Sequence, residues 1–218
     1  MKRILIFGLL LILASSGCAW FRTAEEKSAP ELAGDGMDEF TGGNYRDAIE
    51  SFEKLKDWYP FSKYAILAEL KIADAHYYLK EYEEAIFAYE EFENLHPRNE
   101  AIPYVIYQMG RCYFEQLDTI DRDQTAARKG LDVFQRLVTQ FPDTSYANKA
   151  REHIKECQQS LAGHEFYVGI FYYKKKHYKA ALERFKNVIS EYPDVGVHHE
   201  ALEYIAQCEA SMEKQAEN

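Results

Sequence analysis

The chain has 218 residues, of which 36 are Asp or Glu and 26 are Lys or Arg, so its formal net charge is −10 at pH 7. An acidic chain is repelled by the phosphates of nucleic acids and by anionic lipid head groups, so neither is an expected partner. Basic protein surfaces suit this charge better. The length allows one or two globular domains, or one continuous array of repeats.

The first 18 residues have the order of an export signal. Two basic residues precede ten apolar residues at 4–13, and small residues then lead directly to Cys18. This order is typical of a secretory signal, and the Cys after the cleavage point resembles the lipobox of bacterial lipoproteins. Ten helical residues cover about 15 Å of a hydrocarbon core about 30 Å thick, so the run is too short to span a membrane. We expect residues 1–17 to be removed and Cys18 to carry the lipid, with plain secretion as the alternative.

The residues around Cys18 favour the outer membrane. Ala19 stands where an inner-membrane retention signal typically has Asp, whereas Ser15 departs from the Leu that is usual in a lipobox. Loss of the signal removes Lys2 and Arg3 and no acidic residue, so the mature chain has 24 basic and 36 acidic side chains and a net charge of −12. Residues 18–29 are polar and have no helical period, which predicts a lipidated, flexible tether.

A helical pattern recurs four times in the rest of the chain. Each copy has apolar residues at i, i+4 and i+7 around a small residue, and each ends at a proline, which cannot continue a helix. These prolines are Pro60, Pro97, Pro142 and Pro193. A second predicted helix with a small residue and aromatics precedes each copy. The pairs resemble the tetratricopeptide repeat.

The predicted fold is an all-α tetratricopeptide-repeat superhelix of about ten helices in five pairs. The prolines lie 37, 45 and 51 residues apart, against a nominal repeat of about 34. We attribute the excess to a polar loop at 118–125 and to an additional helix at 145–161, and we expect a closing helix at 197–212. The predicted parts of the solenoid at 30–213 are N-terminal repeats at 30–97, a middle repeat with the insertion at 98–142 and C-terminal helices at 143–213.

Three cysteines occupy one repeated position. Cys112, Cys157 and Cys208 each lie fifteen residues after a repeat proline. Equivalent positions of stacked repeats lie farther apart than the Cα separation of about 7 Å that limits a disulfide. We therefore expect three unpaired, largely buried thiols. A zinc site has no close ligand pair to support it.

The sequence contains no recognisable catalytic motif. His164-Glu165 and His199-Glu200 lack the second His of a zinc-binding helix. The acidic segment 121–125 lacks the third ligand and the Gly of a calcium loop. There is also no nucleophile elbow and no phosphate-binding Gly loop. We expect no enzyme activity, no cofactor and no metal.

Several segments are similar to the BamD family, the lipoproteins of the outer-membrane β-barrel assembly (BAM) machinery. They are Tyr59-Pro60-Phe61-Ser62, Asp121-Arg122-Asp123, Leu161-Ala162-x-His164-Glu165 and Tyr178-x-Ala180-Ala181-x-x-Arg184. The Ala, aromatic and Pro residues are shared by repeats in general, whereas the segment at 161–165 is more specific. The resemblance covers roughly residues 35 to 212 and includes the lipobox.

The resemblance implies a periplasm-facing scaffold of the BAM complex at the outer membrane. Its implied partners are the periplasmic domains of BamA, unfolded outer-membrane β-barrel proteins and other BAM lipoproteins. The family's Arg that couples to BamA corresponds to Arg184, for which the alternative is an exposed partner in an intrahelix ion pair. Another periplasmic repeat adaptor, such as a Tol-associated cell-division coordinator, remains open but would lack the lipobox. A periplasmic enzyme with accessory repeats would need a catalytic domain.

An aromatic strip is predicted along the first helices of the N-terminal repeats. Positions four residues after the small residue of each first helix are expected to line the concave face. An extended peptide suits such a strip, and Arg111 would receive its C-terminal carboxylate. The alternative is that the rings pack between helices and bind nothing, and their exposure distinguishes the two. The predicted peptide groove comprises Phe40, Tyr77, Tyr104, Tyr107, Arg111 and Phe114.

Overall fold

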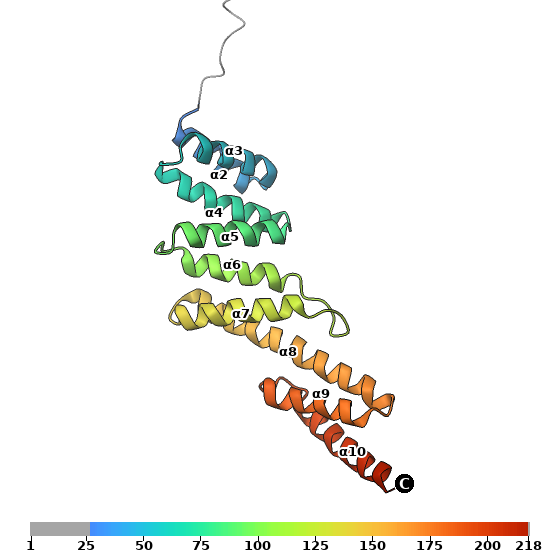
Figure 1. The fold of residues 1–218 in the computed structure, drawn as a ribbon. Coiled ribbons are helices and arrows are strands. Elements are labelled where there is room, and N and C mark those ends of the chain that lie inside the picture. Colours follow the sequence, from blue (N-terminus) through green and yellow to red (C-terminus); the bar gives the residue numbers. More distant parts are fainter. Residues whose placement is uncertain (1–26, 218) are drawn as a thin grey trace, which may run out of the picture. The chain divides into compact units, whose positions relative to one another are not determined.

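A computed structural model describes residues 27–217 (Figure 1), so the predicted signal peptide and the predicted lipidation site Cys18 lie outside the described residues. Within 27–217 the structure has nine α-helices and no strand, which confirms the all-helical class. No helix in this range is both long and apolar enough to cross a membrane. The helices are α2 (Ala29–Thr41), α3 (Tyr45–Trp58), α4 (Lys63–Tyr78), α5 (Tyr82–Leu95), α6 (Ile102–Phe114), α7 (Thr125–Gln140), α8 (Ser145–Lys174), α9 (Tyr178–Glu191) and α10 (His198–Ala216).

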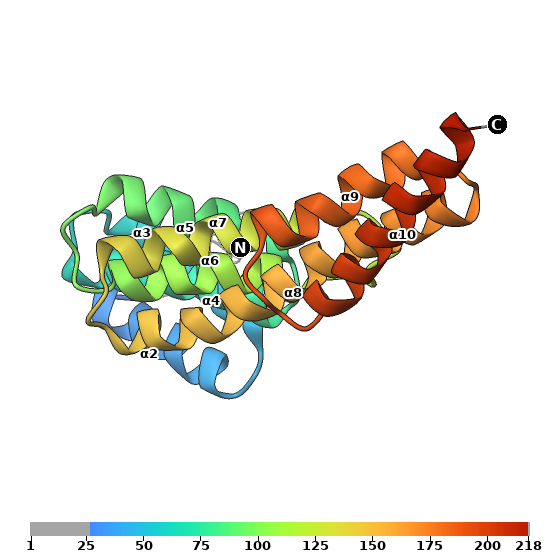
Figure 2. The same cartoon turned by 90° about the horizontal axis from the view of Figure 1, so that it is seen from below.

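The chain divides after Ala68, inside α4, into two compact units. The first unit contains α2, α3 and the start of α4, and α2 packs against α3. The second unit contains the rest of α4 and all later helices, and from α5 onward each helix packs against the next. Figure 2 shows α8 running from the side of α6 and α7 to the side of α9 and α10, and its packing against α6, α7 and α9 agrees with this view. The second unit is therefore organised around α8.

The repeat prolines mark helix ends, as the sequence predicts. The helices α3, α5, α7 and α9 each end two residues before one of these prolines. A proline sterically disfavours helical backbone in the residue before it, so the helix stops there. The turn that follows reverses the chain for the next helix.

A left-handed residue closes the turn inside three of the helix pairs. Gly43, Lys80 and Lys176 occupy equivalent positions and have φ values of 81°, 61° and 61°. In each turn the next amide donates a hydrogen bond to the carbonyl five residues earlier, over 2.9 to 3.0 Å. A β-carbon is disfavoured in this backbone region, so the two lysines are more strained than the glycine.

The structure differs from the sequence prediction at α8. The additional helix expected at 145–161 and the helix after it are one continuous 30-residue helix. The described chain therefore has nine helices where about ten were predicted. No proline lies between 142 and 193, and a lone glycine such as Gly163 costs a helix only about 1 kcal/mol. Burial of Leu161 and Ala162 at the expected break favours continuation of the helix.

Paired helices approach closely where a glycine faces an aromatic ring. The pairs are Gly36 with Phe52, Gly110 with Phe134 and Gly169 with Phe185. All three rings are fully buried. A β-carbon at Gly36 would lie only 2.6 Å from the Phe52 ring. The recurring small residue thus makes room for the ring of the partner helix.

The three repeated cysteines are free and fully buried, which confirms the predicted burial. Burial raises the pKa of both the Cys112 and Cys157 thiols to about 12. Because the thiolate is the reactive form, these side chains act as small core residues.

We expect Gly36→Ala to lower the free energy of unfolding by about 1 to 3 kcal/mol, because the added methyl overlaps the Phe52 ring. Gly34, two residues earlier in α2, is the matched control, since a β-carbon there meets no atom within 4 Å. Gly34→Ala should raise the free energy of unfolding by about 0.5 to 1 kcal/mol through helix propensity. Urea denaturation followed by circular dichroism measures both changes. Equal effects would show that the glycine–ring contact does not limit helix approach.

Candidate functional site

Residues 160–165 of α8, here called the α8 junction, contact two elements that lie apart in the sequence. One is the insertion loop, residues 115–124, between α6 and α7. The other is α9. Adjacent residues on a helix point about 100° apart, so neighbouring side chains of the junction reach different elements.

His164 and Gly163 hold the tip of the insertion loop. The Nδ1 atom of His164 lies 2.6 Å from the carbonyl oxygen of Ile120, which identifies Nδ1–H as the donor. A β-carbon at Gly163 would lie 3.1 Å from Ile120 Cγ2. The small residue therefore allows the loop to approach the helix closely enough for the hydrogen bond.

A buried amide fixes the rest of the insertion loop. The Gln124 side chain is 2% exposed, and its Nε2 donates to the carbonyl oxygens of Thr119 and Arg122 at 3.1 and 3.2 Å. Its Oε1 accepts a hydrogen bond of 2.7 Å from the Ser160 hydroxyl. A buried donor or acceptor that is left without a partner costs about 1 to 3 kcal/mol of stability. The Gln124 amide therefore favours the loop conformation in which its hydrogen bonds are made.

On the other side of α8, Glu165 orients Arg184 of α9. Nη1 of Arg184 donates to the two carboxylate oxygens at 3.0 and 3.1 Å, and Asn187 Nδ2 donates to the same carboxylate at 3.4 Å. The side chain of Glu165 is 17% exposed and that of Arg184 is 40% exposed. The intrahelix pair considered from the sequence is therefore wrong, because the ion pair joins two helices. The guanidinium is held in one direction and still reaches solvent.

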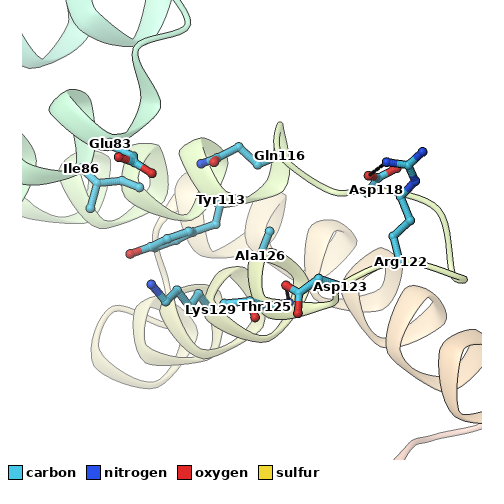
Figure 3. Close-up of a pocket in the computed structure, with 10 residues that line it drawn as sticks. All are labelled: Glu83, Ile86, Tyr113, Gln116, Asp118, Arg122, Asp123, Thr125, Ala126 and Lys129. Carbon is cyan, nitrogen blue, oxygen red and sulfur yellow. Dashed lines mark hydrogen bonds and ion pairs between the residues drawn. The ribbon is translucent and has the colours of Figure 1, made fainter.

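An open cavity of about 800 Å³ lies beside the insertion loop, between α5, the end of α6 and the start of α7 (Figure 3). Its charged lining has both signs, and Arg122 lies 3.6 Å from Asp118 within it. Lys129 Nζ lies 5.4 Å from the centroid of the Tyr113 ring. Sequence reasoning missed this cavity, because its walls come from three separate segments; the polarity of the insertion was the one available signal.

The predicted groove residues differ in exposure. Tyr77 and Tyr107 are each 8% exposed, so their rings pack between helices. Tyr104 and Phe114 are half-buried and keep part of their rings accessible. Phe40 belongs to the first unit, where its ring is half-buried. Peptide binding by these residues stays a prediction, but Tyr77 and Tyr107 do not present open faces.

Arg111 already has a carboxylate partner. Its guanidinium lies 4.8 Å from the centroid of the Tyr77 ring, and its Nη2 lies 2.9 Å from Glu115 Oε1. The Tyr77 hydroxyl donates to the same oxygen at 3.1 Å. Burial alone would raise the pKa of Glu115, but the hydrogen bonds from Arg111 and Tyr77 hold it below its ordinary value. An incoming carboxylate would have to share or displace Glu115.

Tyr104 belongs to a buried polar network around Asp74. The hydroxyls of Tyr104 and Tyr89 donate to Asp74 Oδ1 at 2.6 and 2.7 Å, and Lys71 Nζ lies 2.7 Å from Oδ2. Burial and the charge of Asp74 raise the pKa of Tyr104, so the hydroxyl stays protonated and remains a donor. The network gives Tyr104 a structural role in joining α4 to α6.

His153 of α8 is a residue that sequence reasoning missed. Its ring stacks against Phe134 at a centroid distance of 5.1 Å and lies 4.4 Å from the Phe114 ring. Nε2 lies 3.2 Å from the Tyr107 hydroxyl, while the buried Nδ1 has no hydrogen-bond partner among the described residues. Burial lowers the pKa of His153, so the ring is neutral at pH 7.

The two histidines considered as metal ligands, His164 and His199, have different partners. His164 is engaged by the Ile120 carbonyl, and the exposed His199 lies 3.2 Å from Glu203. Within residues 27–217, no group of three His, Cys, Asp or Glu side chains is arranged to hold a metal ion.

Comparison with known proteins relates the chain to a family of outer membrane lipoproteins. The family model YfiO, described as an outer membrane lipoprotein, matches residues 25–218. The protein named outer membrane protein assembly factor BamD in Neisseria gonorrhoeae is 32% identical, over 93% of this chain and 82% of its own. Its namesake in Rickettsia prowazekii is also 32% identical, over 88% and 76%. The Caulobacter vibrioides namesake is 34% identical over 82% of this chain, which spans only 58% of that relative.

A solved structure supports the fold. The TPR2AB domain of yeast Sti1, solved as a complex with pHSP90, gives a TM-score of 0.53 at 18% identity, over 84% of this chain and 70% of that one. At this identity the similarity concerns the fold alone, and it confirms the tetratricopeptide-repeat architecture. Together with the family model and the relatives, it shows that this chain is a tetratricopeptide-repeat protein of the BamD (YfiO) family of outer membrane lipoproteins.

Proposed function

We propose that this protein is a lipid-anchored, periplasm-facing scaffold of the β-barrel assembly machinery, which binds the periplasmic domains of BamA and unfolded outer-membrane proteins and catalyses no reaction. The name shared by its relatives, outer membrane protein assembly factor, supports the role. The observation that carries the proposal is the α8 junction, because the family-like segment at 161–165 orients the family-like Arg184. The family match favours this role over a Tol-associated adaptor.

Cys18 is the proposed membrane attachment, because it follows a signal-like segment and the described helices include no candidate span. Buried acyl chains contribute about 0.8 kcal/mol per methylene, so two or more chains give lasting attachment. We expect Cys18→Ala to release folded protein into the soluble periplasmic fraction. Retention of this variant in membranes after a high-salt wash would contradict the anchor.

Arg184 is the proposed contact to BamA. The Glu165 carboxylate uses one end of the guanidinium, and 40% of the Arg184 side chain remains exposed. A planar guanidinium held by one carboxylate loses little further freedom when it binds a second acidic group. The ion pair therefore prepares Arg184 for a partner and also joins α8 to α9. The two effects have to be separated experimentally.

A charge swap separates them. Arg184→Glu alone places two carboxylates together, so we expect it to lower both the melting temperature and the affinity for BamA. The double variant Glu165→Arg/Arg184→Glu restores an ion pair between the helices but moves the cation to α8. We expect it to regain most of the melting temperature and still bind the BamA periplasmic domains at least about tenfold more weakly. Circular dichroism and calorimetric titration measure the two properties. Recovery of both would assign Arg184 a purely structural role.

The receiving surface for unfolded substrates is proposed around Arg111, with the accessible parts of Tyr104 and Phe114 beside it. Tyr77 supports this surface from beneath, because its ring lies under Arg111 and its hydroxyl bonds Glu115. Truncation of a buried aromatic ring costs about 3 to 5 kcal/mol, so Tyr77→Ala would confuse unfolding with lost binding. The peptide is the better component to vary.

A peptide that copies the C-terminal segment of a β-barrel protein tests the surface in two forms, with a free C-terminal carboxylate and with an amide. We expect amidation to weaken binding to the wild type about tenfold, because the charge-assisted hydrogen bond to Arg111 is lost. Arg111→Gln should bind both forms equally. Fluorescence anisotropy gives the four affinities. An unchanged effect of amidation in Arg111→Gln would place the carboxylate elsewhere.

A further inference from the structure

The turn between α8 and α9 is a dense cluster of positive charge on an acidic protein. Residues 174–179 read Lys-Lys-Lys-His-Tyr-Lys, in a chain with a net charge of −10. None of these four lysines forms an ion pair with a described residue, whereas Lys186 further along α9 pairs with Glu209. Within residues 27–217, no carboxylate therefore lies within ion-pair distance of these four lysines.

Two of the lysines lie at positions where the local backbone or the helix dipole is unfavourable for a lysine. Lys176 has φ 61°, the left-handed conformation that Gly43 adopts in the equivalent turn. Lys179 lies in the first turn of α9, where the helix dipole is unfavourable for a cation. Lys174 needs no such explanation, because cations are favoured in the last turn of a helix. Lys80 has the same strained backbone in the turn between α4 and α5, so strain alone assigns no role. The turn between α8 and α9 differs in that its strained lysine lies among three further lysines without ion-pair partners.

Lys176 and Lys179 border an open pocket of about 840 Å³ between the end of α8, the start of α9 and the end of α10, helices drawn in orange to red in Figure 1. Lys176 and Lys179 supply the cationic groups of its lining, which also contains Glu183. Tyr172, Tyr178 and Met212 provide apolar surface. Pockets of about 300 to 1,000 Å³ hold small ligands or a few side chains, so this one has room for part of a peptide.

We propose that this pocket binds an acidic segment of a partner protein, with carboxylates at Lys176 and Lys179 and an aromatic or aliphatic side chain against Tyr172 and Met212. An apolar wall beside the cations fits a peptide better than a bare anion. The acidic charge of the remaining chain opposes adsorption to a flat anionic bilayer. The site does not use Arg184, so it stands independently of the proposed contact to BamA.

The probe is a fluorescein-labelled decapeptide of eight Glu and two Phe residues, added to the full-length protein in neutral detergent. Lys176→Glu should weaken its binding at least about fivefold, because one attractive charge becomes repulsive. Lys80→Glu is the matched control, since Lys80 has the same φ of 61° in the turn between α4 and α5. We expect that control to change the affinity less than about twofold. Binding should also weaken as salt rises.

A second pair of variants excludes a folding artefact. Lys176→Gly and Lys80→Gly both relieve the left-handed strain, so both should raise the melting temperature. Only Lys176→Gly should also weaken peptide binding, which a structural role for Lys176 would not produce. Equal losses for the two positions, or no binding by the wild type, would overturn the proposal. Displacement of the peptide by equimolar inorganic phosphate would overturn it in favour of a bare anion site.

Discussion

In the second unit, the insertion loop and α9 both pack against the α8 junction, and this packing determines where their exposed side chains lie. Because neighbouring helix residues point in different directions, His164 can bind the loop while Glu165 binds Arg184. Gly163 permits the close approach on the loop side. Functional residues on loops and helix surfaces are most effective when a rigid element positions them, and α8 has that role here.

The continuity of α8 holds the insertion loop and α9 in fixed positions relative to each other. A helix interrupted near residue 161 would leave the insertion loop and Arg184 on separately moving elements. In the 30-residue helix, the Ser160 and His164 contacts to the loop are fixed relative to the Glu165 contact to α9. The cavity beside the insertion loop and the proposed BamA contact are thus attached to the same rigid support. The lysine-rich turn follows directly at the end of that helix.

The sequence predicted those features that depend on local chemistry. Helices end before the repeat prolines, and the repeated cysteines are buried. It failed where the outcome depends on neighbours that are distant in sequence. The helical period predicts on which face of its helix Tyr77 lies, but it cannot show that Arg111 of another helix and Glu115 at the end of that helix cover this face. It likewise cannot distinguish an intrahelix partner of Arg184 from Glu165 on another helix.

The break expected in α8 failed for a different reason. The repeat length suggested two helices, but repeat length alone does not end a helix. Neither a proline nor a left-handed glycine lies between 161 and 169, and burial of the side chains at 161 and 162 favours continuation. Physical stop signals therefore predict helix ends more reliably here than the repeat length does.

The most direct test of a scaffold role in β-barrel assembly is affinity isolation of the tagged, full-length protein from detergent-solubilised membranes, with partners identified by mass spectrometry. If the protein acts as proposed, a β-barrel insertase with periplasmic domains is recovered in near-stoichiometric amount and is depleted from the Arg184→Glu isolate. Recovery of Tol-system proteins in place of any β-barrel insertase, with the protein folded and membrane-bound, would contradict the proposed function.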